Sequence, residues 1–206
     1  MDPILLLTAL AVAWWALKRR YDHERIALLA QHLRNTQIEP HMEALIDGYL
    51  RALGESDAER RDAVWGLLAT RETALVSQFD DFARGFAAVG VVPARVHKGA
   101  ISLPYADRVF PVPTFDMRDL LALHARGIRA AVANDDGLPA KARAHRITAE
   151  LLLMQHSCHW YCRSQAVASA RLLRRHQTSH AQALAAVAPA TREGYVALTG
   201  VRLPTA

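Results

Sequence analysis

The sequence predicts an all-α protein, in which a single N-terminal transmembrane anchor precedes an irregular helical bundle with one Pro-rich, non-helical crossover. An uncharged apolar run opens the chain, and apolar residues later recur at three- and four-residue spacing, which is typical of core-facing helices. Four prolines fall within residues 91–115. We expect an anchor with a basic flank at residues 1–20 and a cytoplasmic helical domain at residues 21–206.

The anchor is predicted from residues 3–17, which carry no charge and include one polar side chain, Thr8. At about 1.5 Å per residue this run measures roughly 22 Å, whereas the hydrocarbon core of a bilayer is about 30 Å thick. The flanks therefore have to reach the headgroups, where tryptophan is favoured and long basic side chains can snorkel. The residues expected at the membrane surface are Trp14, Trp15, Lys18, Arg19 and Arg20.

Two other interpretations of this run stay open, a signal peptide and a soluble N-terminal helix. A signal peptide carries positive charge before its apolar run, but here the only charged side chain in that position is Asp2. The basic flank after the run places the body in the cytoplasm by the positive-inside rule. Because Arg greatly outnumbers Lys and Ala is abundant, we expect a bacterial protein, single-pass in the inner membrane with its N-terminus outside.

The first helix is expected to continue to Leu33 and to break at Asn35 and Thr36. Two capping-box patterns then predict helix starts, residues 36–39 (Thr-x-x-Glu) and residues 56–59 (Ser-x-x-Glu). The second helix should stop at Gly54 and the third at Gly90. Apolar residues of the third helix repeat as one core-facing face.

The Pro-rich segment 91–115 is predicted to be a crossover strap. Residues 95–103 could form a small hairpin that turns at Lys98-Gly99. We expect the strap to pack on the helices through its apolar residues, although long connections of this kind are often functional or bound to partners. The residues expected to pack are Val109, Phe110, Val112 and Phe115.

The C-terminal part is predicted to be helical throughout. Asp116 should cap a helix that ends in the turn cluster 134–137. Pro139 then suits the first turn of a helix that meets no breaker until residues 177–179. A shorter helix up to Ala188 and a last turn capped by Thr191 complete the chain.

The net charge of +5 is concentrated in residues 139–180, where seven basic residues face a single acid, Glu150. This stretch indicates an anionic partner such as a lipid headgroup, an acidic protein or nucleic acid, of which nucleic acid is the least expected. A solvated helix face is an equally good interpretation. The residues predicted to contact such a partner are Arg163, Arg171, Arg174 and Arg175.

Four metal-ligand side chains lie within seven residues, namely His156, Cys158, His159 and Cys162. On a helix at 100° per residue, His156 and Cys158 point to roughly opposite sides, so one metal cannot take all four. A soft metal such as Zn would use His159 and Cys162 with ligands from another helix.

The same helical geometry offers an alternative to a metal site. Both cysteines fall on the most apolar stripe, as buried free cysteines often do, and His156 falls on the side of Arg163 and Arg174. In one long helix, His176 and His180 lie too far along to join this cluster. We therefore expect no cofactor, with a soft metal as the alternative.

No nucleophile elbow, phosphate-binding loop or dinucleotide-binding fingerprint occurs, so whether the chain is an enzyme is uncertain and the balance leans against it. The function expected is that of a membrane-anchored helical interaction or scaffold protein. Its expected partners are the lipid bilayer and a membrane or cytoplasmic protein, and a homo-oligomer is left open. The alternatives are a metal-binding or redox-linked protein and a protein that binds anionic surfaces or nucleic acid.

Overall fold

The structure is a computed structural model and describes residues 2–202, so Met1 of the predicted anchor and residues 203–206 of the predicted domain lie outside it. It is mostly helical, which confirms the predicted all-α class. The elements in chain order are α1 (Pro3–Leu33), α2 (Ile38–Gly54), α3 (Ala58–Ala87), α4 (Val91–Ala94), β1 (Arg95–His97), a 3₁₀ turn (Ala106–Arg108), β2 (Thr114–Asp116), α5 (Met117–Ala133), α6 (Ala140–Cys162), α7 (Gln165–His176), α8 (His180–Ala186) and α9 (Pro189–Thr199).

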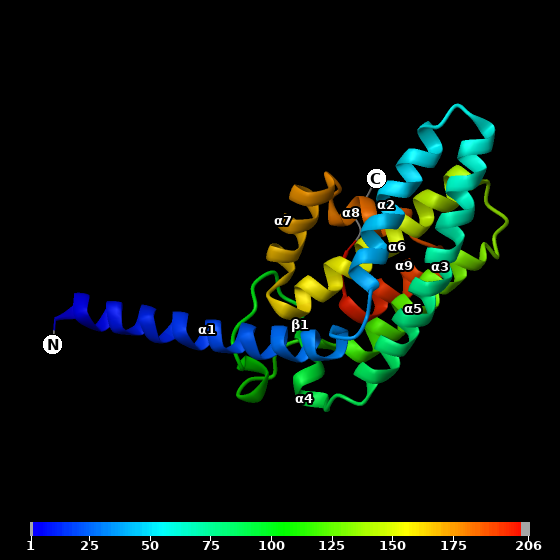
Figure 1. Cartoon of the computed structure of the whole chain (residues 1–206). Coiled ribbons are helices and arrows are strands. Elements are labelled where there is room, and N and C mark those ends of the chain that lie inside the picture. Colours follow the sequence, from blue (N-terminus) through cyan, green and yellow to red (C-terminus); the bar gives the residue numbers. More distant parts are fainter. Residues whose placement is uncertain (1, 203–206) are drawn as a thin grey trace.

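Helix α6 is the centre of the bundle, and α1, α2, α5, α7 and α8 all pack against it. Its middle and C-terminal turns are buried on almost every side, which agrees with their apolar sequence. Helices α2 and α3 form an antiparallel pair against α5 and α6, and α9 packs on α5 (Figure 1). The fully buried core includes Leu45, Leu75, Phe79, Phe86, Leu120, Leu121, Ile147, Leu151, Tyr161 and Tyr195.

Helix α1 continues without a break to Leu33, as predicted, but its two halves differ in surroundings. The second half packs on α3 and α6, whereas the first half extends away from the bundle (Figure 1). Among residues 2–202, no helix combines the length and the apolar character that a membrane crossing requires. The single-pass transmembrane helix predicted for residues 1–20 therefore finds no support here.

The strap 91–115 differs from its prediction in three ways. It is not wholly non-helical, because it contains α4 and the 3₁₀ turn Ala106–Arg108. Strand β1 pairs antiparallel with β2, with Val96 opposite Phe115, so no hairpin turns at Lys98-Gly99. Phe115 is buried as expected, but Val109 is 72% exposed and Phe110 is 64% exposed. The ends of the segment are joined by the strand pair, and this leaves the middle free to lie on the surface.

The prediction of one long helix after Pro139 is wrong, because the helix is interrupted between α6 and α7. Arg163 leaves the helical region (φ −136°, ψ −84°), and the side chain of Ser164 accepts the backbone N–H of Val167 as the N-cap of α7. The break lets α7 fold back on α6. Every angular position inferred beyond Cys162 for a continuous helix is therefore wrong as well.

Both predicted capping boxes are also wrong. Gln37, rather than Thr36, precedes α2 and makes no capping bond, and the Thr36 hydroxyl instead donates to the Leu33 carbonyl. Asp57, one residue after the expected Ser56, caps α3 by accepting the N–H of Arg60. Asp116 does cap α5 as predicted.

Candidate functional site

The first half of α1 is a continuous stretch of exposed apolar side chains. We call residues 3–17 the apolar arm. Its large side chains are between 43% and 70% exposed, the extremes being Leu17 and Ile4. The exposed side chains are Ile4, Leu5, Leu6, Leu7, Leu10, Val12, Trp14, Trp15 and Leu17. Contiguous apolar surface of this kind marks a site of interaction with a membrane or a protein.

The arm is apolar on all sides. Residues 4–7 are four consecutive large apolar side chains, and steps of 100° along a helix distribute them around its whole circumference. Thr8 is the one polar side chain within the arm, and its hydroxyl donates to the Ile4 carbonyl at 2.8 Å. The arm therefore presents no polar face to water.

The arm is joined rigidly to the body at Tyr21, Asp22 and Arg25, which are all buried. The Arg25 guanidinium lies between the rings of Tyr21 and Tyr161, at 4.5 and 4.8 Å from their centroids. It also donates to the Tyr161 carbonyl at 3.1 Å. Asp22 accepts from Arg163 at 2.9 Å and from Lys18. These contacts fix the direction in which the arm leaves the body.

The basic flank lies at the boundary between the arm and the body. Lys18 pairs with Asp22, and Arg20 donates to Glu24 at 3.0 Å. The Arg19 guanidinium lies 5.3 Å from the Trp15 ring. Both tryptophans stand just before this flank, so aromatic and basic side chains form one band around the helix. Such a band is typical of the membrane–water interface.

Three of the four predicted metal-ligand residues line one cavity of about 270 Å³ between α1, α2, α3 and α6. Its sulfur-containing lining is Met42, Met154, Cys158 and Cys162, and His159 lies beside them. The sequence does not distinguish Met42 and Met154 from ordinary core, because methionine is common on an apolar helix face. Burial raises the pKa of both thiols, that of Cys162 to about 11, so both stay protonated near neutral pH.

The ligands that a metal would need from other helices are not there. Neither His124 nor His41 lines this cavity: His124 Nε2 lies 2.9 Å from the Ser157 hydroxyl, and His41 Nε2 lies 3.3 Å from the Gln78 amide. Within residues 2–202, no group of three or more His, Cys, Asp or Glu side chains could hold a metal ion. The cavity is therefore best described as apolar and lined with thiols.

The prediction that His156 lies on the side of Arg163 and Arg174 is wrong. His156 lies in a buried polar group that we call the histidine cluster (His124, His156, Ser157, His180 and Tyr195). Its ring stacks on His180 with centroids 4.0 Å apart. His180 lies 3.1 Å from the Tyr195 hydroxyl, so the prediction that His180 cannot join this region is wrong. His156, Ser157 and His124 are fully buried, which denies a substrate access to them.

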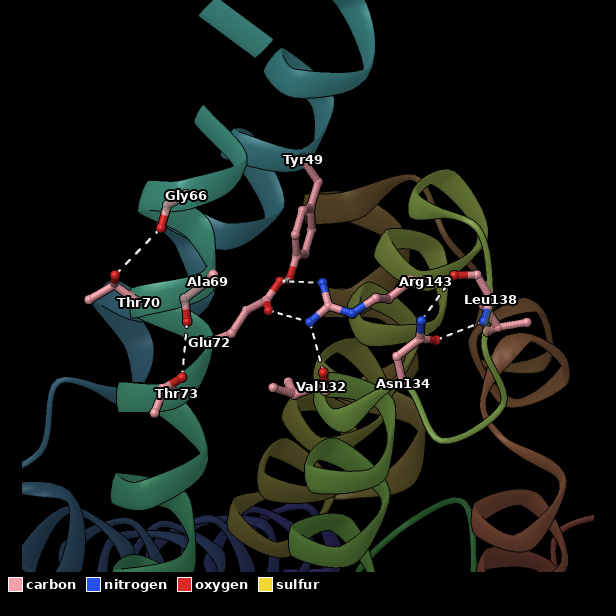
Figure 2. A network of polar contacts seen from close by, with 10 residues as sticks. All are labelled: Tyr49, Gly66, Ala69, Thr70, Glu72, Thr73, Val132, Asn134, Leu138 and Arg143. Carbon is pink, nitrogen blue, oxygen red and sulfur yellow. Dashed lines mark hydrogen bonds and ion pairs between the residues drawn. The ribbon is translucent and has the colours of Figure 1, made fainter. Parts of the chain in front are cut away.

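The predicted basic surface is partly neutralised within the fold. Arg163 pairs with Asp22, and Arg175 pairs with Glu43 and, at 3.8 Å, with Glu39. Arg171 and Arg174 lie exposed on α7. Arg143, which belongs to the same basic stretch, donates a hydrogen bond to the buried carboxylate of Glu72 at 3.0 Å. The Tyr49 hydroxyl donates to the same carboxylate at 2.6 Å (Figure 2).

Comparison of the chain with protein-family models, with curated proteins and with solved structures finds no significant match.

Proposed function

We propose that this chain is a membrane-attached helical interaction protein, which inserts the apolar arm into a bilayer and holds its helical body at the membrane surface. The observation that carries the proposal is the arm itself, with nine large apolar side chains exposed along one rigid helix. Removal of one such side chain from water contributes about 1.5–3 kcal/mol, so nine together provide ample free energy for insertion.

A bilayer fits the arm better than a protein groove does. A helix that pairs with another helix carries an apolar stripe and keeps polar residues on its other side. The arm has no such polar side, and this also argues against a helix that lies flat in the interface. Hydrocarbon surrounds an inserted helix on every side and so covers all of the exposed residues at once.

The flanks support an orientation for the inserted arm. With Trp14 and Trp15 at the headgroups, the exposed Arg19 and Arg20 face anionic lipid phosphates, and the body begins directly below them at Tyr21. The basic flank favours a cytoplasmic body, in a bacterial inner membrane if the Arg- and Ala-rich composition indicates the source. An arm of roughly 22 Å is shorter than the hydrocarbon core, so insertion draws the body close to the membrane surface.

Attachment to a membrane raises the effective concentration of the body near other membrane proteins. Because α1 is one continuous helix and its Arg25 is hydrogen-bonded to the Tyr161 carbonyl of the body, the body is held in one orientation relative to the arm. A rigid, oriented helical surface at the membrane is suited to binding a protein partner there, and this is the role we assign to it.

Flotation of the full chain with anionic phospholipid vesicles tests the proposal. The double variant Leu6→Asp, Leu10→Asp places two charges within the arm, where one charge at the centre of a bilayer costs about 2.5–3.5 kcal/mol. We expect the unmodified chain to float with the vesicles and the variant to stay at the bottom of the gradient.

A matched control separates insertion from a general effect of added charge. Leu50 and Leu67 are 68% and 70% exposed on α2 and α3, far along the chain from the arm. The double variant Leu50→Asp, Leu67→Asp should float as the unmodified chain does. An unmodified chain that fails to float, or an arm variant that floats equally well, would overturn the proposal.

A further inference from the structure

We propose that residues 101–110, which we call the collar segment, form a second membrane contact next to the arm and insert their apolar side chains into the headgroup region. This inference rests on the proposed function, because it assigns the surface of the body that meets the same bilayer. The middle of the Pro-rich strap is thereby assigned as a lipid-binding element.

The collar segment exposes four large apolar side chains within ten residues. Val109 and Ile101 are 72% and 71% exposed, Phe110 is 64% exposed, and Leu103 is 46% exposed. Residues between them, Ser102 and Ala106, are buried. The segment is therefore attached to the body by its small residues and turns its large apolar residues outward, which is the reverse of an ordinary surface loop.

The backbone holds this arrangement in place. Tyr105 adopts a left-handed conformation (φ 56°), and the 3₁₀ turn Ala106–Arg108 follows it. The carbonyl of Ala106 accepts the N–H groups of Val109 and Phe110 at 3.1 and 2.8 Å. Val109 and Phe110 are therefore displayed by a hydrogen-bonded turn, so little conformational entropy is lost when they insert.

Contacts between side chains place the collar segment beside the root of the arm. The Tyr105 ring lies edge-on to Tyr21 with centroids 5.1 Å apart, and its hydroxyl donates to Glu24 at 2.9 Å. In Figure 1 the green strap lies against α1 at the point where the helix leaves the bundle. An arm inserted along its own axis brings this part of the body to the bilayer surface.

The charges around the collar segment suit phospholipid rather than a protein groove. Arg108 is exposed next to Val109, and its guanidinium lies 4.6 Å from the Tyr105 ring. Arg20 approaches from the arm side, where Glu24 joins it to Tyr105. Apolar side chains flanked by arginine and tyrosine match the depth profile of an interface, with hydrocarbon beyond a layer of phosphates. The short length of the arm also favours this contact, because it brings the body close enough to the bilayer for the collar segment to reach the headgroups.

Fluorescence of an environment-sensitive probe, nitrobenzoxadiazole, tests this inference on the full chain. The probe is attached to Cys at position 110 in the variant Phe110→Cys and, as a control, at position 56 in the variant Ser56→Cys, at the exposed turn between α2 and α3. Of the two native cysteines, Cys162 is buried and Cys158 is partly buried, so the unmodified chain treated identically gives the background. On anionic vesicles we expect a blue shift and a several-fold gain in emission at position 110, and no change at position 56.

A second measurement reports the energy of the contact. Phe110→Asp should weaken partitioning into vesicles by about tenfold or more, because it removes a large apolar side chain from the interface. Leu67→Asp, equally exposed on α3, should not. Vesicle-bound protein whose probe at position 110 still reports water overturns the collar contact and leaves the proposed function standing. A chain that does not bind vesicles at all overturns both.

Discussion

At the residue scale, the body depends on Glu72, a carboxylate that is only 2% exposed in the middle of α3. Arg143 of α6 binds it through both terminal nitrogens and also donates to the Val132 carbonyl at 2.8 Å (Figure 2). Tyr49 of α2 donates to the same carboxylate at 2.6 Å. One buried charge thus links α2, α3, α5 and α6, and all of its partners come from other elements.

The variant Arg143→Met should therefore destabilise the fold. Methionine fills similar space but leaves Glu72 buried without its counter-charge, and breaking a buried pair in this way costs about 3–5 kcal/mol. Thermal unfolding in a mild detergent, followed by circular dichroism, measures the loss. Arg84→Met removes an arginine from a pair with Asp81 that is exposed on both sides, and it should change little. Equal stability of the two variants would contradict this account of Glu72.

The histidine cluster gives the fold a defined sensitivity to acid. Burial lowers the pKa of His124 to about 3, of His156 to about 2 and of His180 to about 4, with nearby histidines adding to the effect on His156. The unfolded chain binds these protons near pH 6.5, and the folded chain does not. Stability is therefore fully present above about pH 6.5 and is lost as the pH falls from there, toward 4 for His180 and further, toward 3 and 2, for His124 and His156, by up to about 1.4 kcal/mol per pH unit for each histidine.

The variant His180→Gln tests this origin of the acid sensitivity. It removes one of the shifted groups, so the midpoint of thermal unfolding should fall less steeply between pH 6.5 and 4.5 than in the unmodified chain. His23 is exposed on α1, and His23→Gln should leave the slope unchanged. Parallel slopes for all three proteins would show that other groups cause the acid sensitivity.

At the scale of the elements, α5, α6 and α9 meet at Gly127. A Cβ atom there would lie 2.4 Å from the Thr191 hydroxyl and 2.6 Å from a carboxylate oxygen of Glu150, which is fully buried. The other carboxylate oxygen of Glu150 accepts the N–H of Ala188 at 3.0 Å, just before α9. Gly127 is therefore needed for the close approach of these three helices and not for its backbone freedom.

Gly127→Ala should accordingly lower the free energy of unfolding by about 1–3 kcal/mol, the usual effect of overpacking a core. Gly66 provides a matched control, because it also lies within a helix but has no atom within 4 Å of an added Cβ. Gly66→Ala should raise stability by about 0.5–1 kcal/mol, since alanine is the better helix former. The two substitutions should thus shift the unfolding midpoint in opposite directions, and a shared direction would contradict the packing described at Gly127.

The same elements show what the sequence can predict. The end of α5 follows from local chemistry, because Asn134 accepts the left-handed conformation (φ 60°) that closes the helix. The start of α5 follows from the cap that Asp116 supplies. The break after α6 has a weaker signal, since residues 163–164 contain neither Gly nor Pro and the one local cue is Ser164, the N-cap of α7. It arises from tertiary packing of α7 on α6, which a periodicity argument cannot detect.

That one missed break accounts for the errors at the candidate sites. A continuous helix would carry His180 far from His156, whereas the fold places their rings 4.0 Å apart. The apolar character of the arm, by contrast, is a property of consecutive residues and was predictable. Its exposure was not, because an apolar run reads the same whether the fold buries it or leaves it outside.

At the scale of the whole molecule, the arm, the basic flank and the collar segment lie at one end, and the body is built to hold them there. The hydrogen bond from Arg25 to the Tyr161 carbonyl fixes the arm and its basic flank to the body. The hydrogen bond from Tyr105 to Glu24 fixes the collar segment to the same helix. The far end, at the turn between α2 and α3, points away from the arm (Figure 1). Under the proposed function the first of these ends is the membrane end, and protein partners would bind at the other end and along the exposed helices between the two.

Hydrogen exchange of the full chain in anionic lipid nanodiscs, followed by mass spectrometry, tests the central claim most directly. The backbone amides of residues 4–17 should exchange much more slowly in nanodiscs than in detergent-free solution, because inserted helix amides lose contact with water. Amides at the turn between α2 and α3 should exchange equally in both. Protein that co-purifies with nanodiscs while residues 4–17 exchange as fast as in solution would contradict insertion of the arm.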